Sequence, residues 1–525
     1  MDAIDVEIVR CSLANVLAET EANICQTAFS PIVYEVRDFC TALLRPDGTS
    51  IAQGIGGVPI FLGDLDAPVR DLVHRRGASL RPGDVYLTNE AAICGQHLNN
   101  VVALRPVFWE DRLAAIAAVR VHWIDVGGRA AGGWVSDTTD VYQEGLQLPC
   151  LLAEQDGRLD PGIRDLITTN VRYPEAVLGD LRAQLAATAL LEERLQELVS
   201  TYGSASFDTA VETIWSDSEA LARSAVRDWR IGRAEAEAVL DPLAGEETGP
   251  RIHVAVTRRA DGQVVVDFTG TSPEVTHPIN SGYGAAVAAR IAFKLLTLPT
   301  RPSDEGAYRP LELRIPDGTF LSARGDAPLA QWSAPLPTAV DVVLAAMSQL
   351  APGHVPAAHH GELGGFALFG TDPDTGRAFY QIDTITGGWG ATPQGPGRSA
   401  LKSICHGDTY TTPVEVEERN ARVLVRSYHL RRGSGGSGRH RGGDGTERVY
   451  DIRTTTHLNL GLVRSGLAPW GVEGGGQGAR SEALVQRPGQ APFTILRGTG
   501  IELPPGTTLS IRSGGGGAYG GAGSR

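Results

Sequence analysis

The sequence predicts an α+β protein with several domains: an N-terminal mixed α/β part, a helical segment and a β-rich, glycine-rich C-terminal part. The chain has 525 residues, which is more than one hydrophobic core usually holds. Apolar residues recur at helical spacing at the N-terminus and again in the middle of the chain, whereas short apolar runs between turn residues predominate afterwards. We therefore expect these parts to span residues 1–160, 161–245 and 246–525.

The N-terminal part is predicted to begin with a helix and to continue as hairpins. Residues 4–20 place apolar side chains near one face of an amphipathic helix. In residues 38–54, two short apolar runs surround the turn Pro-Asp-Gly, which indicates a hairpin. A second hairpin is expected in residues 101–122, where Trp-Glu-Asp-Arg joins two apolar runs. His97 lies just before this hairpin and His122 lies at its far end.

The middle and C-terminal parts differ in their patterns. One helix is predicted to end at Gly203, and a second at about residues 207–229. Residues 251–272 indicate a hairpin around Ala-Asp-Gly-Gln. Two further helices are expected at residues 285–298 and 338–350. Beyond residue 360 the pattern is strand and turn with very little helix.

Glycine is unusually abundant, with 64 residues against a usual share of about 7%. Many of these glycines lie in clusters after residue 360, and no fixed-period repeat is visible. The cluster at residues 433–445 also contains Arg439, His440 and Arg441. We expect a glycine-rich turn between strands there, rather than an anion-binding loop. The last cluster is predicted to be either a disordered tail or a loop over a substrate.

Charge and cysteine content limit the classes of partner. The formal net charge is -14, which argues against a nucleic-acid-binding surface. The six cysteines contain no Cys-x-x-Cys pair, as expected for reduced thiols in a cytoplasmic protein. The N-terminus lacks an apolar signal segment, and no run approaches the length of a membrane span. We therefore expect a cytoplasmic protein that binds neither nucleic acid nor membrane.

Two histidines suggest a metal site. His97 is followed three residues later by Asn100, and His122 three residues later by Asp125. Imidazole nitrogens with carboxylate or amide oxygens suit several divalent metals. Pairing of the hairpin strands would bring the two histidines together, and Asp38, at the start of another strand, is a possible fourth ligand. The alternative is two ordinary histidines beside turns, since Asn and Asp are common turn residues.

Blocks along nearly the whole chain resemble one known family. They include "AFSPIVYEVRDFCTALLRPDGTSIAQ", "VHWIDVGG", "VDFTGTSPEVTHPINSGYG", "RRGSGGSGRHRGGDG" and "APWGVEGGG". The chain resembles the hydantoinase B/oxoprolinase family, the B subunits of ATP-dependent cyclic-amide hydrolases, which is related to acetone and acetophenone carboxylase subunits.

The resemblance implies a ligand set for a divalent metal, Zn, Mn or Fe. The family block usually reads Gly-Thr/Ser-His-x-x-Asp, and the implied ligands here are Asp38, His97, Asn100 and His122. This sequence departs from the pattern at Asn100, where an aspartate is usual. An amide binds a cation only through its carbonyl oxygen, so the site has one negative charge fewer.

The resemblance also implies a reaction. The chain would open a hydantoin, 5-oxoproline or lactam through a phosphorylated imidate and a metal-bound water, with His122 and Asp125 as the catalytic residues. Asp125 would orient a ligand or accept a proton. ATP with Mg is expected on a hydantoinase A-like partner subunit in a hetero-oligomer, because no Walker-type motif is present. Two alternatives are a subunit of an ATP-dependent ketone carboxylase and a catalytically inactive structural partner of an A subunit.

Overall fold

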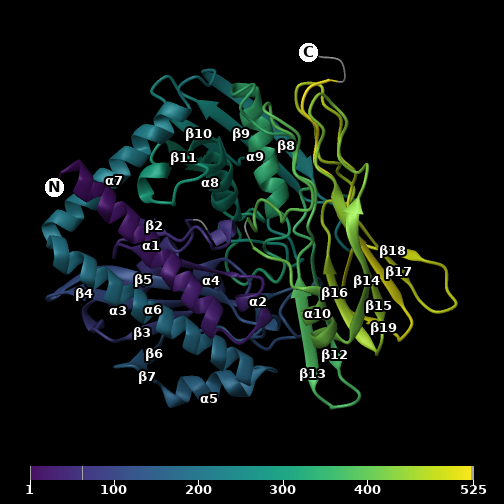
Figure 1. The fold of residues 1–525 in the computed structure, drawn as a ribbon, viewed down its shortest axis with the longest axis horizontal. Helices are drawn as coiled ribbons and strands as arrows, with labels where there is room; N and C mark the ends of the chain where they lie inside the picture. Colours follow the sequence, from purple (N-terminus) through teal and green to yellow (C-terminus); the bar gives the residue numbers. More distant parts are fainter. Residues whose placement is uncertain (1, 62, 408, 522–525) are drawn as a thin grey trace.

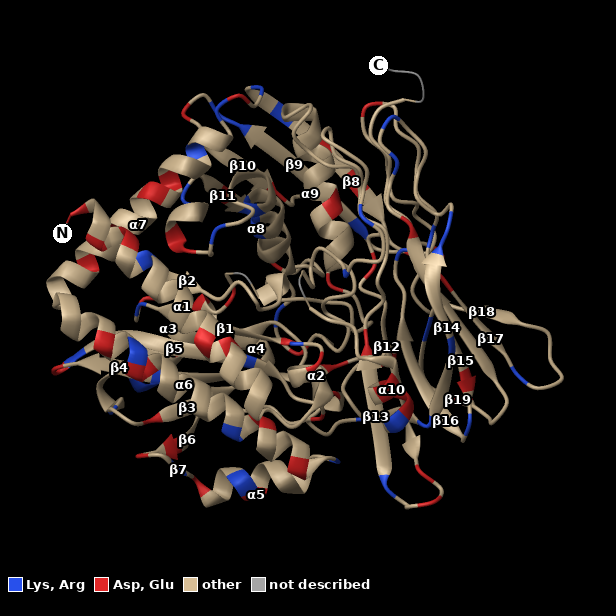
Figure 2. Ribbon diagram, viewed as in Figure 1, with Lys and Arg blue, Asp and Glu red and all other residues tan. Residues whose placement is uncertain are grey.

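The computed structural model describes residues 2–61, 63–407 and 409–521. It confirms the predicted α+β class: helices and four sheets share the chain. Figure 1 shows the N-terminal elements, coloured purple to teal, on one side of the molecule, and the green-to-yellow C-terminal strands on the other. Acidic and basic residues are interspersed along the outer helices (Figure 2).

The N-terminal part is built on a seven-stranded sheet with the order β2-β1-β5-β4-β3-β6-β7. Every neighbouring pair in it is antiparallel. Both predicted hairpins are confirmed, since β1 pairs with β2 and β4 pairs with β5. The strands are β1 (Phe39–Leu44), β2 (Ser50–Gln53), β3 (Val85–Thr88), β4 (Asn100–Trp109), β5 (Arg112–His122), β6 (Leu151–Gln155) and β7 (Arg158–Leu159).

Long helices cover this sheet. α6 (Pro174–Tyr202) packs against β4, β5 and α1 (Ala3–Thr27), and α7 (Ser204–Ala225) packs against α1 and α6. The predicted first helix is therefore confirmed, although it extends further than expected. Gly203 ends α6 with a φ of 79°, a conformation that glycine adopts without strain. Shorter helices are α2 (Pro31–Tyr34), α3 (Asp66–Arg76), α4 (Ala91–Cys94) and α5 (Pro161–Asn170).

A second sheet has the order β11-β10-β9-β8 and carries the two predicted helices, α8 (Gly284–Thr297) and α9 (Leu336–Leu350). Its strands are β8 (Gly232–Val239), β9 (Arg251–Arg258), β10 (Val264–Asp267) and β11 (Leu311–Arg314). β8 lies in the segment expected to be helical, yet it pairs with β9 along its whole length. One cluster of buried side chains runs from Val6 to Val463.

The C-terminal part contains two antiparallel sheets, β13-β12-β16-β19 and β14-β15-β20-β17-β18, with the short helix α10 (Val414–Ala421) beside them. A separate hydrophobic cluster fills the space around them. The strands are β12 (Gly365–Thr371), β13 (Ala378–Asp383), β14 (Val423–Arg431), β15 (Gly445–Ile452), β16 (Thr456–Gly461), β17 (Glu482–Gln486), β18 (Phe493–Ile495), β19 (Arg497–Leu503) and β20 (Thr508–Arg512).

The glycine clusters of the C-terminal part form a layer of segments that are bonded to one another through their backbones. Gly516 donates its backbone N–H to Gly443, and its carbonyl accepts from Gly436, both at 2.9 Å. A Cβ at Gly516 would lie 2.0 Å from the carbonyl oxygen of Trp389, so only glycine fits. Residues 513–520 are buried, so this part of the last cluster is not a disordered tail; residues 522–525 lie outside the described part.

The structure also bears on the state of the cysteines and on membrane-spanning helices. All six cysteines carry free thiols. Within the described residues, no helix combines the length and apolar character needed to cross a bilayer.

Candidate functional site

A small cavity lies between the N-terminal sheet and the C-terminal strands. Much of its wall is apolar: Ile32, Val36, Ile60, Phe61, Trp134, Trp332, Leu363 and Ile382. The polar lining consists of Asp38, His97, Asn100, His122, Ser333, Asp383, Thr384 and His406. An apolar cavity with a few convergent polar groups is the usual form of a small-molecule site.

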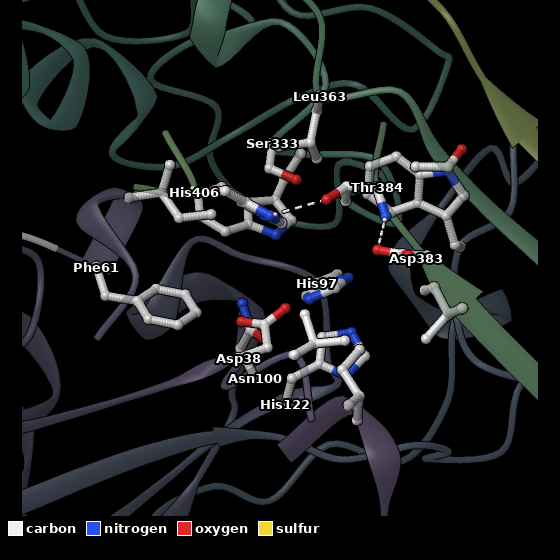
Figure 3. A pocket seen from close by; sticks show the side chains of 17 residues that line it. Asp38, Phe61, His97, Asn100, His122, Ser333, Leu363, Asp383, Thr384 and His406 are labelled. Atoms are coloured by element: carbon white, nitrogen blue, oxygen red, sulfur yellow. Dashed lines mark hydrogen bonds between the residues drawn. The ribbon is translucent and has the colours of Figure 1, made fainter. Parts of the chain in front are cut away.

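The pairing of β4 and β5 positions the predicted ligand residues. Asn100 begins β4 and stands directly opposite His122, which ends β5. The carbonyl of Asp38 accepts the backbone N–H of His122 at 3.0 Å, and the carbonyl of His97 accepts that of Asn100 at 3.2 Å. The two hairpins therefore bring all four residues to one wall of the cavity, where Figure 3 shows them grouped.

The side chains of these four residues present unpaired polar atoms. The His97 and His122 rings meet edge to face, with centroids 4.8 Å apart. Asp38 is 8% exposed and the other three are less so. Among the described residues, no hydrogen-bond partner is found for Asp38 Oδ1, His97 Nδ1, Asn100 Oδ1 or His122 Nδ1. Unpaired buried polar atoms are costly, so the four of them that line one cavity are suited to contact a polar or charged ligand.

Burial controls the protonation of this group. It raises the pKa of Asp38 to about 7, and Lys402 opposes the rise. It lowers the pKa of His97 to about 4, and together with the nearby His97 it lowers the pKa of His122 well below its usual value. Both imidazoles are therefore neutral at neutral pH, which is the form that binds metal.

The donor set fits a divalent cation in its chemistry: two neutral imidazoles, one carboxylate and one amide oxygen. In the described part of the chain, however, no three His, Cys, Asp or Glu side chains are arranged so that they could hold a metal ion. Asp38, His97 and His122 as they stand therefore do not form a complete metal-binding group.

Asp125 is placed away from the group. The described lining of the cavity does not include it. Its carboxylate accepts the backbone N–H of Arg172 at 2.6 Å, the Arg172 guanidinium at 3.0 Å and the N–H of Gly132 at 3.4 Å. Asp125 thus ties the loop after β5 to the start of α6, and this geometry gives no support to its predicted role as orienter or proton acceptor.

The opposite wall carries residues that the sequence did not single out. His406 Nδ1 lies 3.3 Å from Thr384 Oγ1. Lys402 donates to Asp383 at 2.6 Å and to Thr384 Oγ1 at 3.0 Å. Burial, with a contribution from Lys402, lowers the pKa of His406 to about 3. These residues lie far from His97 along the chain, and only their polarity within a glycine-rich, apolar region could have drawn attention.

The chain is similar to known proteins over almost its whole length. The family model described as "Hydantoinase B/oxoprolinase" matches residues 2–522. An uncharacterized protein of Methanocaldococcus jannaschii is 32% identical over 529 residues, which cover 99% of this chain and 91% of that protein. Caprolactamase subunit beta of Pseudomonas jessenii is 27% identical over 537 residues, covering 99% of this chain and 91% of the relative.

Solved structures share the fold. The crystal structure of the ATP-dependent caprolactamase from Pseudomonas jessenii superposes with a TM-score of 0.92 at 25% identity, covering 99% of this chain and 91% of that chain. Nucleotide-free acetone carboxylase superposes with a TM-score of 0.89 at 17% identity, covering 99% of this chain and 76% of that chain, which is a likeness of fold alone.

Proposed function

The chain belongs to the hydantoinase B/oxoprolinase family, and on that premise we propose that it is the B-type subunit of an ATP-dependent hydrolase that opens a cyclic amide. The substrate class is a hydantoin, 5-oxoproline or a lactam. One observation carries the proposal: a largely apolar cavity has a polar wall with four buried nitrogen and oxygen atoms that lack a hydrogen-bond partner among the described residues. We place the substrate ring against this cavity, with its amide carbon toward the polar wall.

The reaction needs activation because an unstrained cyclic amide is stabilised by resonance. Transfer of the γ-phosphoryl group of ATP to the amide oxygen gives an imidate phosphate and ADP. Water then adds to the amide carbon, and cleavage of the C–N bond of this adduct, with transfer of a proton to nitrogen, gives an open-chain acyl phosphate. A second water hydrolyses the acyl phosphate to the carboxylate and inorganic phosphate. The hydrolytic half of this sequence is what we assign to the cavity.

The chain's own residues have separate tasks in this scheme. Asp38, His97, Asn100 and His122 would hold a divalent cation, Zn, Mn or Fe. When bound, that ion would supply a positive charge that lowers the pKa of water at the reacting carbon. Trp134 and Trp332 line the same cavity, where their rings can pack against an apolar substrate ring and exclude bulk water.

The phosphorylating half belongs to a partner. The sequence has no Walker-type motif, and a relative of similar length is called subunit beta. We assign ATP with Mg to a hydantoinase A-like subunit in a hetero-oligomer with this chain. The imidate phosphate would then pass between subunits, or the cavity would be completed by the partner.

The test is reconstitution. The chain is expressed alone and together with a hydantoinase A-like subunit, and ring opening and ADP release are measured with hydantoin, 5-oxoproline and caprolactam. We expect coupled turnover only from the pair. Turnover by the chain alone would contradict the partner assignment. Failure of the pair on cyclic amides, with ATP-dependent carboxylation of a ketone instead, would favour the carboxylase alternative. A pair whose turnover is unaffected by His122→Asn would indicate an inactive structural subunit.

A further inference from the structure

Asn100 is connected to a fully buried row of side chains behind the cavity wall. Its Nδ2 donates to Gln96 Oε1 at 2.7 Å. Gln96 Nε2 in turn donates to Asp64, and Arg120 donates to the other oxygen of Asp64 at 2.7 Å. Gln96 is 1% exposed, while Asp64 and Arg120 are completely buried.

The direction of every hydrogen bond in this row follows from its far end. A guanidinium can only donate, so Asp64 accepts from Arg120. With Asp64 accepting on its second oxygen as well, Gln96 must turn its NH2 toward Asp64 and its carbonyl toward Asn100. Asn100 must then turn its own NH2 toward Gln96. Its carbonyl oxygen is left over, and it is one of the four unpaired atoms of the cavity residues.

Arg120 is itself held in place. Its guanidinium lies 4.9 Å from the ring centroid of Phe61, a stacking contact that favours the cation. Arg120 is on β5, the strand that ends at His122. Arg120, which fixes the direction of the hydrogen bonds in the row, therefore lies on the same strand as His122, one of the predicted ligands.

The orientation matters because the two ends of an amide have opposite effects on a cation. A carbonyl oxygen binds a cation, whereas an NH2 group repels it. A carboxylate offers an oxygen in either orientation and needs no such control. We propose that Gln96 is a positioning residue of the metal site: it selects the orientation in which Asn100 offers its carbonyl oxygen to the cation. This inference rests on the metal site of the proposed function.

A double-mutant cycle on the full chain tests the proposal. The affinity for Zn²⁺ and Co²⁺ is measured by competition with a chromophoric chelator for four proteins: the natural chain, Gln96→Met, Asn100→Asp and the double variant. We expect Gln96→Met to weaken binding by about tenfold or more, the usual scale for residues behind the ligands. In the Asn100→Asp background the same change should cost less than about threefold, because a carboxylate needs no orienting partner.

The control is Gln184→Leu. Gln184 is also a buried amide that braces β4 and β5, since its Nε2 donates to the carbonyls of Val101 and Val119, but no hydrogen bond joins it to the Asn100 side chain within the described residues. We expect thermal stability to fall with metal affinity unchanged. If Gln96→Met does not fold, Gln96→Leu replaces it in the cycle.

Two outcomes overturn the inference. Equal losses from Gln96→Met in both backgrounds would mean that Gln96 is only structural. A natural chain that binds neither ion would remove the site itself. Neither outcome decides the cyclic amidase assignment, because the titration uses no substrate and no partner, and ring opening by the reconstituted pair is measured separately.

Discussion

The imidazole rings of His97 and His122 lie edge to face, 4.8 Å between centroids, although 24 residues separate them along the chain. The β4–β5 hairpin causes this, because it places Asn100 directly across from His122 and His97 one turn before Asn100. Two neutral imidazoles therefore lie side by side, with no partner for either Nδ1 among the described residues.

Removal of one imidazole should remove metal binding. His97→Ala takes away a ligand from the proposed set, and we expect the affinity for Zn²⁺ or Co²⁺ to fall by more than about a hundredfold, beyond the usual effect of residues behind the ligands. His354→Ala serves as the control, because His354 is exposed and should leave binding unchanged. Equal affinities for the two variants would rule out His97 as a ligand.

The pH dependence of metal binding should report Asp38. Its folded pKa is raised to about 7 by burial, so below that pH a cation must displace a proton from the carboxylate. Affinity should therefore fall about tenfold per pH unit as the pH decreases below about 7, and level off above it. Co²⁺ titrations between pH 5.5 and 8 measure the slope. Asp38→Asn should bind more weakly and lose this part of the slope; an unchanged slope would exclude Asp38.

Asp125 should prove structural. Asp125→Asn weakens its bonds to Arg172 and Gly132, and we expect a loss of about 1–3 kcal/mol in the free energy of unfolding, as for a buried charged hydrogen-bond group. Metal affinity should stay the same. Urea unfolding and chelator competition on one preparation separate the two effects. A loss of metal affinity with unchanged stability would restore the orienting role predicted from the sequence.

The glycine layer should not tolerate side chains. Gly516→Ala would place a Cβ 2.0 Å from the Trp389 carbonyl, and we expect destabilisation of about 1–3 kcal/mol or more, as for overpacking. The control is Gly395→Ala, where the added Cβ meets no atom within 4 Å and stability should change by less than about 0.5 kcal/mol. Thermal unfolding compares the two; equal melting temperatures would show that the layer can expand.

The sequence by itself determined the features that depend on local pattern. Turn residues between apolar runs predicted both N-terminal hairpins, and helical spacing predicted α1, α6, α7, α8 and α9, because these elements form from neighbouring residues. The hairpin also allowed the grouping of His97, Asn100 and His122 to be foreseen. That Asp38 would join them followed from the family resemblance and the start of β1.

Only the tertiary structure decided what depends on segments distant in sequence. It brought His406 and Thr384 to the opposite wall of the cavity, paired β8 with β9, and buried residues 513–520 of the last glycine cluster. It also made Arg172 the hydrogen-bond partner of Asp125, and Gln96 the hydrogen-bond partner of Asn100. The physical reason is that close packing and the need to pair buried polar groups determine such contacts. The local periodicity of the sequence indicates neither.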